Sequence, residues 1–159
     1  MKFGLMLRPR ALIFGLAAAA LLVTGAQRAN AEAQLLVDAV TGKVLHAENA
    51  TYPWYPASVT KIMTAYTALR AVKEGKVKLD TLLTVSKNAT SQAPTKMGFT
   101  AGTKVTLDNA IKMIMVKSAN DVSVVIAEGV GGSIEGYADM MNANARRLGM
   151  TQTLSLIHI

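Results

Sequence analysis

The chain has 159 residues, a formal net charge of +7 and no cysteine, and 51% of its residues are hydrophobic. This length allows one domain with a sizeable core. The absence of cysteine excludes disulfides and thiol chemistry. The chain has two histidines, His46 and His158, which is too few to favour a Ser-His-Asp triad or a zinc site. We therefore expect no metal and no cofactor.

The N-terminus has the form of a secretory signal peptide. Residues 1–10 carry three basic side chains and no acid, residues 11–26 carry no charge, and Ala29-Asn30-Ala31 offers a small-x-small cleavage site. The apolar run is short for a membrane-spanning helix, which needs about 20 residues. We expect cleavage near Ala31 and export to the periplasm or cell envelope.

The positive charge falls once this leader is removed. Residues 1–31 hold four basic side chains and no acid, so the net charge drops from +7 to +3. The remaining lysines are scattered along the chain and are typical of solvated faces. We expect no nucleic-acid partner.

The residues after the leader predict a β-hairpin and a rigid loop. Residues 34–39 and 43–48 are predicted to be two strands around a turn at Thr41-Gly42. Residues 52–56 contain two prolines, which fix the backbone and bias the preceding residues toward extended conformations.

The rest of the chain is predicted to be mostly helical. Apolar residues near a 3.6 period predict a helix over residues 59–72, and a short irregular or strand segment follows over residues 82–105. Helical patterns then continue to about Leu148, with a helix stop and turn at residues 129–132. Strands first and helices afterwards indicate the α+β class.

The segment Ser58-Val59-Thr60-Lys61 is the strongest candidate for chemistry. A serine hydroxyl is a poor nucleophile until a base takes its proton, and Lys61 would lie one helical turn away from Ser58. Ser58 is expected in the first turn of the helix. The plainer alternative makes Ser58 a helix N-cap and Lys61 an exposed lysine.

A second element, Ser118-Ala119-Asn120, falls in a predicted turn between two helices and offers a hydroxyl and a carboxamide. Ser-x-x-Lys followed by Ser-x-Asn begins the signature of penicillin-interacting serine enzymes. The third part, Lys-Thr-Gly or Lys-Ser-Gly, does not occur in the 159 residues. Two partial matches are interpreted as plain structure: Ser86-Lys87-Asn88 as strand exit and loop, and Lys96-Met97-Gly98 as a segment with the wrong central residue.

With these motifs, the stretch from about residue 33 to 153 resembles the serine D-alanyl-D-alanine carboxypeptidases, the low-molecular-mass penicillin-binding proteins of peptidase family S11. The resemblance is carried by residues 55–66 and 118–121, with lesser matches at residues 38–45, 96–98 and 147–150. It implies a β-lactamase/DD-peptidase-like α+β fold in incomplete form. The N-terminal hairpin and a helical region are present, and the C-terminal sheet strands are missing.

The resemblance also implies a reaction, the removal of the terminal D-alanine from peptidoglycan pentapeptide ending in D-Ala-D-Ala through an acyl-enzyme. Ser58 would be the nucleophile and Lys61 the general base. Ser118 would shuttle a proton, and Asn120 would bind the substrate carbonyl and position Lys61. β-Lactams would acylate the same serine as inhibitors. Membrane association would use a C-terminal segment that is not among these residues.

This interpretation divides the chain into a signal peptide (1–31), the N-terminal part of the catalytic domain (32–153) and a tail that does not follow the family (154–159), which we interpret as artefactual. A two-stranded hairpin without its sheet partners is marginal in water, so we expect the chain alone to be unstable and inactive. Two alternatives stay open: a serine β-lactamase, and a non-catalytic peptidoglycan-binding protein of the same fold.

Overall fold

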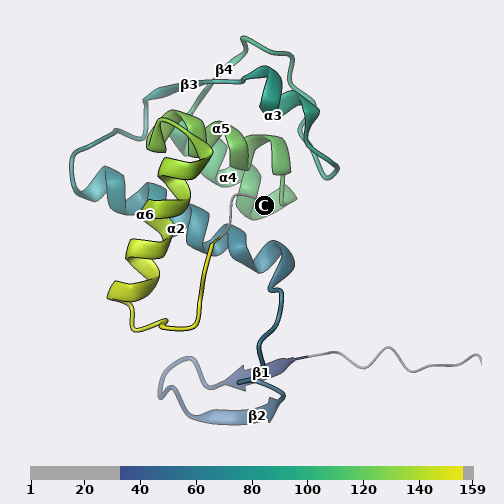
Figure 1. Cartoon of the computed structure of the whole chain (residues 1–159), viewed down its shortest axis with the longest axis vertical. Coiled ribbons are helices and arrows are strands. Elements are labelled where there is room, and N and C mark those ends of the chain that lie inside the picture. The colour runs from purple at the N-terminus through teal and green to yellow at the C-terminus, as the bar shows by residue number, and fades with distance from the viewer. Residues whose placement is uncertain (1–32, 156–159) are drawn as a thin grey trace, which may run out of the picture. The chain divides into compact units, whose positions relative to one another are not determined.

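The computed structural model describes residues 33–155 (Figure 1). The chain divides into two units, with the boundary between Tyr55 and Pro56. The predicted signal peptide and residues 156–159 of the predicted tail lie outside the described residues.

The first unit contains a β-hairpin. Strand β1 (Gln34–Val37) pairs antiparallel with β2 (Val44–Glu48), which confirms the predicted strand pair with slightly shorter strands. The turn between them is organised by Asp38, whose carboxylate oxygen Oδ1 accepts the backbone N–H groups of Val40 and Thr41 at 3.1 and 2.7 Å. Hydrogen bonds from Thr41 and Val40 hold the pKa of the Asp38 carboxyl below its usual value, because they favour the charged form.

The second unit is mainly helical. Its elements in chain order are the 3-10 turn η1 (Ala57–Val59), α2 (Thr60–Lys73), β3 (Leu82–Thr84), α3 (Lys87–Ser91), β4 (Lys104–Thr106), α4 (Leu107–Lys117), α5 (Asn120–Gly131) and α6 (Ile134–Arg147). Strands β3 and β4 pair antiparallel. Over residues 33–155 the sheets are therefore two separate two-stranded ribbons, which confirms the predicted α+β class with an incomplete sheet.

Helix α5 forms the centre of this unit (Figure 1). It packs against α2, α3, α4, α6 and strand β3. Residues 121–127 are buried without interruption. A helix that is buried all round must carry apolar or satisfied polar side chains, and Ser123 meets this demand because its hydroxyl donates to the Ala119 carbonyl at 3.0 Å. The start of α5 is thereby fixed by packing on several sides.

Side-chain caps and a glycine set the helix boundaries. The Ser133 hydroxyl accepts the Gly136 N–H at 2.9 Å at the start of α6. Helix α5 ends at Gly131, and Gly132 follows in the left-handed conformation with φ 76°, which glycine adopts at little cost. The predicted helix stop near residues 129–132 is confirmed.

The prediction of a loop at Ser86-Lys87-Asn88 is wrong. Ser86 caps the short helix α3, with its hydroxyl accepting the Ala89 N–H at 2.9 Å, and Lys87 and Asn88 lie in the first helical turn. Serine is among the preferred N-cap residues. A helix of one turn is too short to show an apolar period in the sequence, so only the cap could have revealed it.

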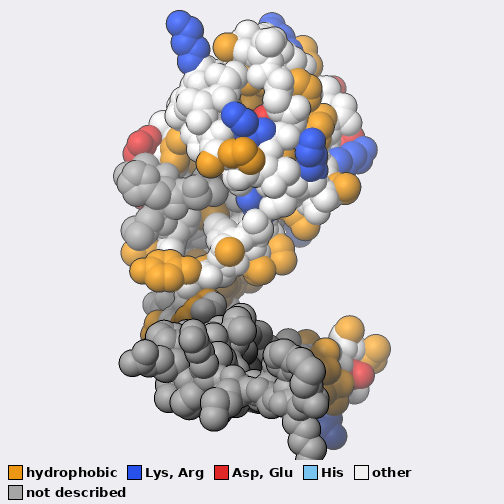
Figure 2. Space-filling model, turned by 90° about the vertical axis from the view of Figure 1, so that its right-hand side faces the viewer, with side chains coloured by type: hydrophobic (Ala, Val, Ile, Leu, Met, Phe, Trp, Pro, Cys, Tyr) orange, Lys and Arg blue, Asp and Glu red, His pale blue; other side chains and the backbone are white. Residues whose placement is uncertain are grey.

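Figure 2 shows Lys and Arg side chains at several separate positions over the helical unit, with hydrophobic side chains between them. This matches the predicted scatter of basic residues. Among the described residues, no helix combines the length and the apolar character needed to cross a membrane.

Candidate active site

Ser58 lies in η1, the 3-10 turn directly ahead of α2, and its side chain is exposed. The sequence pattern predicts it in the first turn of the helix itself, which instead begins two residues later at Thr60. Ala57 precedes Ser58 with φ 47°, a left-handed conformation that costs a non-glycine residue roughly 1–2 kcal/mol. Strained backbone of this kind is concentrated at functional sites, where the surrounding structure holds it in place.

Lys61 is buried, with only 5% of its surface exposed, although it lies in the first turn of α2. Its amine nitrogen Nζ donates to the carboxamide oxygen Oδ1 of Asn120 at 2.7 Å. Burial lowers the pKa of the Lys61 amine, because the low-polarity surroundings disfavour the ammonium form. The alternative of an exposed lysine is therefore wrong. The alternative of Ser58 as an N-cap also fails, because Val59 occupies the N-cap position of α2.

Asn120 is the first residue of α5, and three contacts fix its orientation. Its side-chain nitrogen Nδ2 donates to the carbonyl oxygens of Ala93 and Pro94 at 3.0 and 3.2 Å, and its backbone N–H donates to the Thr95 carbonyl at 2.8 Å. Because the NH₂ group must face these two carbonyls, the carboxamide oxygen faces Lys61.

Ser118 forms the turn between α4 and α5, as predicted. It is half-buried and adopts the left-handed conformation with φ 58° and ψ 36°. Its backbone N–H donates to the Ile114 carbonyl at 3.1 Å, which closes the last turn of α4. Both predicted serines thus lie at or beside a left-handed backbone position.

Of the four predicted site residues, the structure brings two into direct contact, Lys61 and Asn120. Ser58 lies in the turn that leads into α2, the helix of Lys61. Ser118 lies in the turn that leads into α5, the helix of Asn120. Within residues 33–155 no hydrogen bond joins the hydroxyl of either serine to the Lys61 amine.

Sequence reasoning gives no role to Asp121. This carboxylate is 2% exposed and accepts the Met97 N–H at 3.0 Å on both oxygens, the Gly98 N–H at 2.9 Å and the Val122 N–H at 2.9 Å. An acid in the first turn of a helix is the only signal in the sequence. That signal gives no indication that the carboxylate holds a loop more than 20 residues earlier in the chain.

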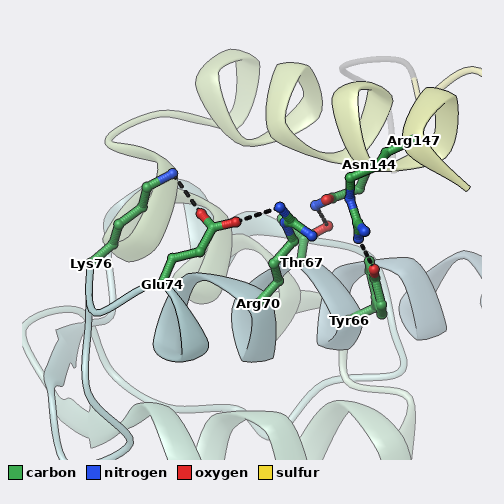
Figure 3. A network of polar contacts seen from close by, with 7 residues as sticks. All are labelled: Tyr66, Thr67, Arg70, Glu74, Lys76, Asn144 and Arg147. Carbon is green, nitrogen blue, oxygen red and sulfur yellow. Dashed lines mark hydrogen bonds and ion pairs between the residues drawn. The ribbon is translucent and has the colours of Figure 1, made fainter.

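A cavity of about 230 Å³ lies away from these residues, along the second half of α2 and the second half of α6. Figure 3 shows polar contacts that line it, including the Glu74 carboxylate between Arg70 and Lys76 at 2.7 and 2.9 Å. The hydrogen bond from Lys76 is the main cause that lowers the pKa of Glu74. The two Glu74 contacts lie at the end of α2 and just after it, whereas Asn144 and Arg147 of α6 donate to the Thr67 and Tyr66 hydroxyls of α2. In the described part of the chain, no cluster of three or more acidic or histidine side chains could hold a metal ion.

The family model for D-alanyl-D-alanine carboxypeptidase, peptidase S11, matches residues 21–155 of the chain. A curated relative, D-alanyl-D-alanine carboxypeptidase DacC of Escherichia coli K12, is 36% identical over 130 residues, which are 78% of this chain and 32% of the relative. The crystal structure of DacD from Francisella tularensis superimposes with a TM-score of 0.74 at 30% identity and covers 98% of this chain and 34% of that one.

The same fold extends to a β-lactamase from Burkholderia vietnamiensis, with a TM-score of 0.63 at 20% identity over 78% of this chain and 44% of that one. That similarity concerns the fold alone. The chain spans about a third of the length of the carboxypeptidases that it matches.

Proposed function

The chain belongs to the D-alanyl-D-alanine carboxypeptidase family, and from this premise we propose that the protein is a serine D-Ala-D-Ala carboxypeptidase of the cell envelope. It would remove the terminal D-alanine from peptidoglycan pentapeptide and would be acylated by penicillins. The observation that carries the proposal is the buried Lys61 amine, held 2.7 Å from the Asn120 oxygen and one helical turn after the exposed Ser58 hydroxyl.

The proposed reaction begins with Ser58. Its hydroxyl oxygen attacks the carbonyl carbon of the penultimate D-alanine, and the Lys61 amine takes the hydroxyl proton as the new C–O bond forms. The C–N bond then breaks, and D-alanine leaves with a proton passed from Lys61 through the Ser118 hydroxyl. Water hydrolyses the resulting acyl ester and regenerates Ser58.

Burial makes Lys61 suitable as the base in this scheme. Because the lowered pKa raises the fraction of free amine near neutral pH, a lone pair is available to accept the Ser58 proton. The Asn120 oxygen accepts one amine N–H, so the lone pair can point elsewhere. By resemblance Asn120 would also bind the substrate's peptide carbonyl, and one of the Nδ2–H bonds to the Ala93 and Pro94 carbonyls would then be exchanged for a bond to the substrate.

The charge that develops on the substrate oxygen needs N–H donors. The Ser58 backbone N–H would supply one half of this oxyanion hole. By resemblance the other half and the carboxylate-binding lysine come from a Lys-Thr-Gly or Lys-Ser-Gly strand, a motif that the 159 residues do not contain. We therefore expect these residues alone to show no carboxypeptidase activity. Release of D-alanine by the isolated 159-residue polypeptide would contradict this.

The test uses the full-length gene product and a fluorescent penicillin. We expect stoichiometric labelling of the wild-type protein and release of D-alanine from a pentapeptide, with both lost in Ser58→Ala. Ser91→Ala is the matched control, because this exposed hydroxyl bonds the Asn88 carbonyl one helical turn away and lies in neither motif.

The outcomes separate the alternatives. Rapid turnover of penicillin in place of a long-lived acyl-enzyme would favour a β-lactamase. Absence of labelling in both wild type and Ser58→Ala, with binding to peptidoglycan retained, would favour a non-catalytic protein of the same fold.

The proposed location depends on the predicted signal peptide, residues 1–31. N-terminal sequencing of the exported protein should begin near Glu32. A mature protein that still begins at Met1 would contradict the proposed cleavage.

A further inference from the structure

We infer that Asp121 is a positioning residue: its buried carboxylate fastens the surface loop of residues 93–98 against the start of α5, and this loop in turn holds the Asn120 carboxamide with its oxygen toward Lys61. The inference rests on the proposed function for its effect on acylation. The structural part of it stands on contacts that do not depend on that function.

The anchoring contacts come from both ends of the loop. At the far end, the Met97 and Gly98 N–H groups donate to the Asp121 carboxylate at 2.9–3.0 Å. At the near end, the carbonyls of Ala93 and Pro94 accept the Asn120 side-chain N–H bonds at 3.0 and 3.2 Å. Two adjacent residues of α5 therefore hold one loop, Asp121 as the acceptor and Asn120 as the donor.

The middle of the loop also bonds to Asn120. The Thr95 carbonyl accepts the Asn120 backbone N–H at 2.8 Å. This N–H belongs to the first residue of α5, where it has no partner within the helix. The loop thus satisfies the open end of the helix and fixes the side chain of the same residue.

A carboxylate suits the position of Asp121 better than an amide. It is 2% exposed and accepts backbone N–H groups from Met97, Gly98 and Val122, and a carboxylate has acceptor sites for all of them with no donor of its own. Hydrogen bonds to a charged acceptor are about twice as strong as neutral ones. An asparagine has the same shape, but it would turn its NH₂ group toward at least one of these donors.

The anchorage affects the orientation of Asn120 because the loop itself is not deeply packed. Ala93, Pro94 and Thr95 are exposed, so water competes for the carbonyls that orient Asn120. If the Met97–Gly98 end is released, those carbonyls no longer have a fixed place, and the Asn120 amide can turn its NH₂ group toward Lys61. The amine would then lose its acceptor.

The experiment compares Asp121→Asn with Asp139→Asn in the full-length gene product. Asp139 is an exposed acid on α6, so its replacement makes the same chemical change away from the loop. Hydrogen exchange is followed in peptides that cover residues 93–99 and 118–122. We expect the Met97, Gly98 and Asn120 amides to exchange at least roughly tenfold faster in Asp121→Asn and at the wild-type rate in Asp139→Asn.

Acylation by fluorescent penicillin is measured in the same variants and again in the Asn120→Ala background. If Asp121 acts through Asn120, Asp121→Asn slows acylation roughly tenfold alone and less than about twofold when Asn120 is already absent. A purely structural role predicts the same loss in both backgrounds, and this additive result would overturn the inference. Unchanged exchange of the loop amides would overturn it as well.

The inference can still be tested if Asp121→Asn does not fold or if the wild-type protein is not acylated. If Asp121→Asn does not fold, Asp121→Glu keeps the charge and enters the same cycle, with a smaller loss that again disappears in the Asn120→Ala background. If the wild-type protein is not acylated at all, the proposed function fails. The exchange of the Asn120 amide then decides the anchoring role alone: faster exchange supports it and wild-type exchange overturns it.

Discussion

The Lys61 amine nitrogen and the Asn120 carboxamide oxygen lie 2.7 Å apart although 59 residues separate them in the chain. The contact joins the first turn of α2 to the first residue of α5. A buried amine must have partners, because an unsatisfied buried polar group costs roughly 1–3 kcal/mol and a charged one costs more. Asn120 meets this need while its other end is held by the Ala93 and Pro94 carbonyls.

Asn120→Ala should weaken both stability and acylation. The variant leaves the Lys61 amine without its acceptor, and we expect unfolding to become easier by about 1–3 kcal/mol. We expect penicillin acylation to slow by roughly 10²–10³-fold, a loss of the size seen when one oxyanion-hole donor is removed. Asn88→Ala is the control, since this exposed amide donates to the half-buried Glu128 carboxylate at 3.0 Å, accepts from Gln92 at 3.3 Å and does not contact Lys61. Equal losses in the two variants would argue against a special role for Asn120.

The pH dependence of acylation should report Lys61. Since burial lowers its pKa, the acylation rate should rise with pH and level off below 10.5, the ordinary value of a lysine amine. Lys61→Arg keeps a positive charge that does not deprotonate in this range, so we expect no measurable acylation at any pH. An unchanged rising limb in Lys61→Arg would assign the base to another group.

Lys61 should also make stability depend on pH. Its pKa in the folded protein lies below 10.5, so between these two values the unfolded chain holds more protons than the folded one. The free energy of unfolding therefore rises with pH across this window. Below the folded pKa the buried amine is an ammonium ion, and its unfavourable burial lowers the stability by the full amount. Urea unfolding at a series of pH values should show this rise in the wild type relative to Lys61→Met. Parallel curves for the two proteins would mean that the pKa of Lys61 is not shifted.

Much of the framework was predictable from local patterns. The hairpin, the helix that follows Ser58 and the turn at Ser118 all depend on neighbouring residues, and the structure confirms them. The short helix α3 escapes prediction because a single turn shows no period, and only the Ser86 cap marks it. The burial of Lys61 could not be derived from α2 alone, because it depends on where α5 packs.

The loop anchored by Asp121 was even harder to predict from the local sequence. Met97 and Gly98 lie more than 20 residues before Asp121, and the contact uses backbone N–H groups that every residue except proline carries. No residue type in the loop therefore marks it as the partner of the acid. Contacts of a side chain with a distant backbone follow from tertiary packing, which the local sequence pattern does not encode.

The packing of α2 against α6 supports the helix that carries Lys61, and it can be tested at Tyr137. This side chain is 1% exposed, and its hydroxyl donates to the Thr64 carbonyl at 2.7 Å. Burial raises the pKa of the Tyr137 hydroxyl, which therefore stays protonated and keeps donating at all working pH values. Nearby, the Asn144 amide donates to the Thr67 hydroxyl at 3.1 Å across the same two helices (Figure 3).

Tyr137→Phe removes one oxygen and keeps the ring, so the change isolates this hydrogen bond. We expect a loss of about 1–1.5 kcal/mol in the free energy of unfolding, measured by urea denaturation, because the Thr64 carbonyl retains its partner within α2. Tyr55→Phe makes the same change at a side chain that is 91% exposed, and there we expect a difference within about 0.5 kcal/mol. If Tyr137→Phe matches Tyr55→Phe, the hydroxyl contributes nothing to the α2–α6 contact, and apolar packing alone must hold these helices together.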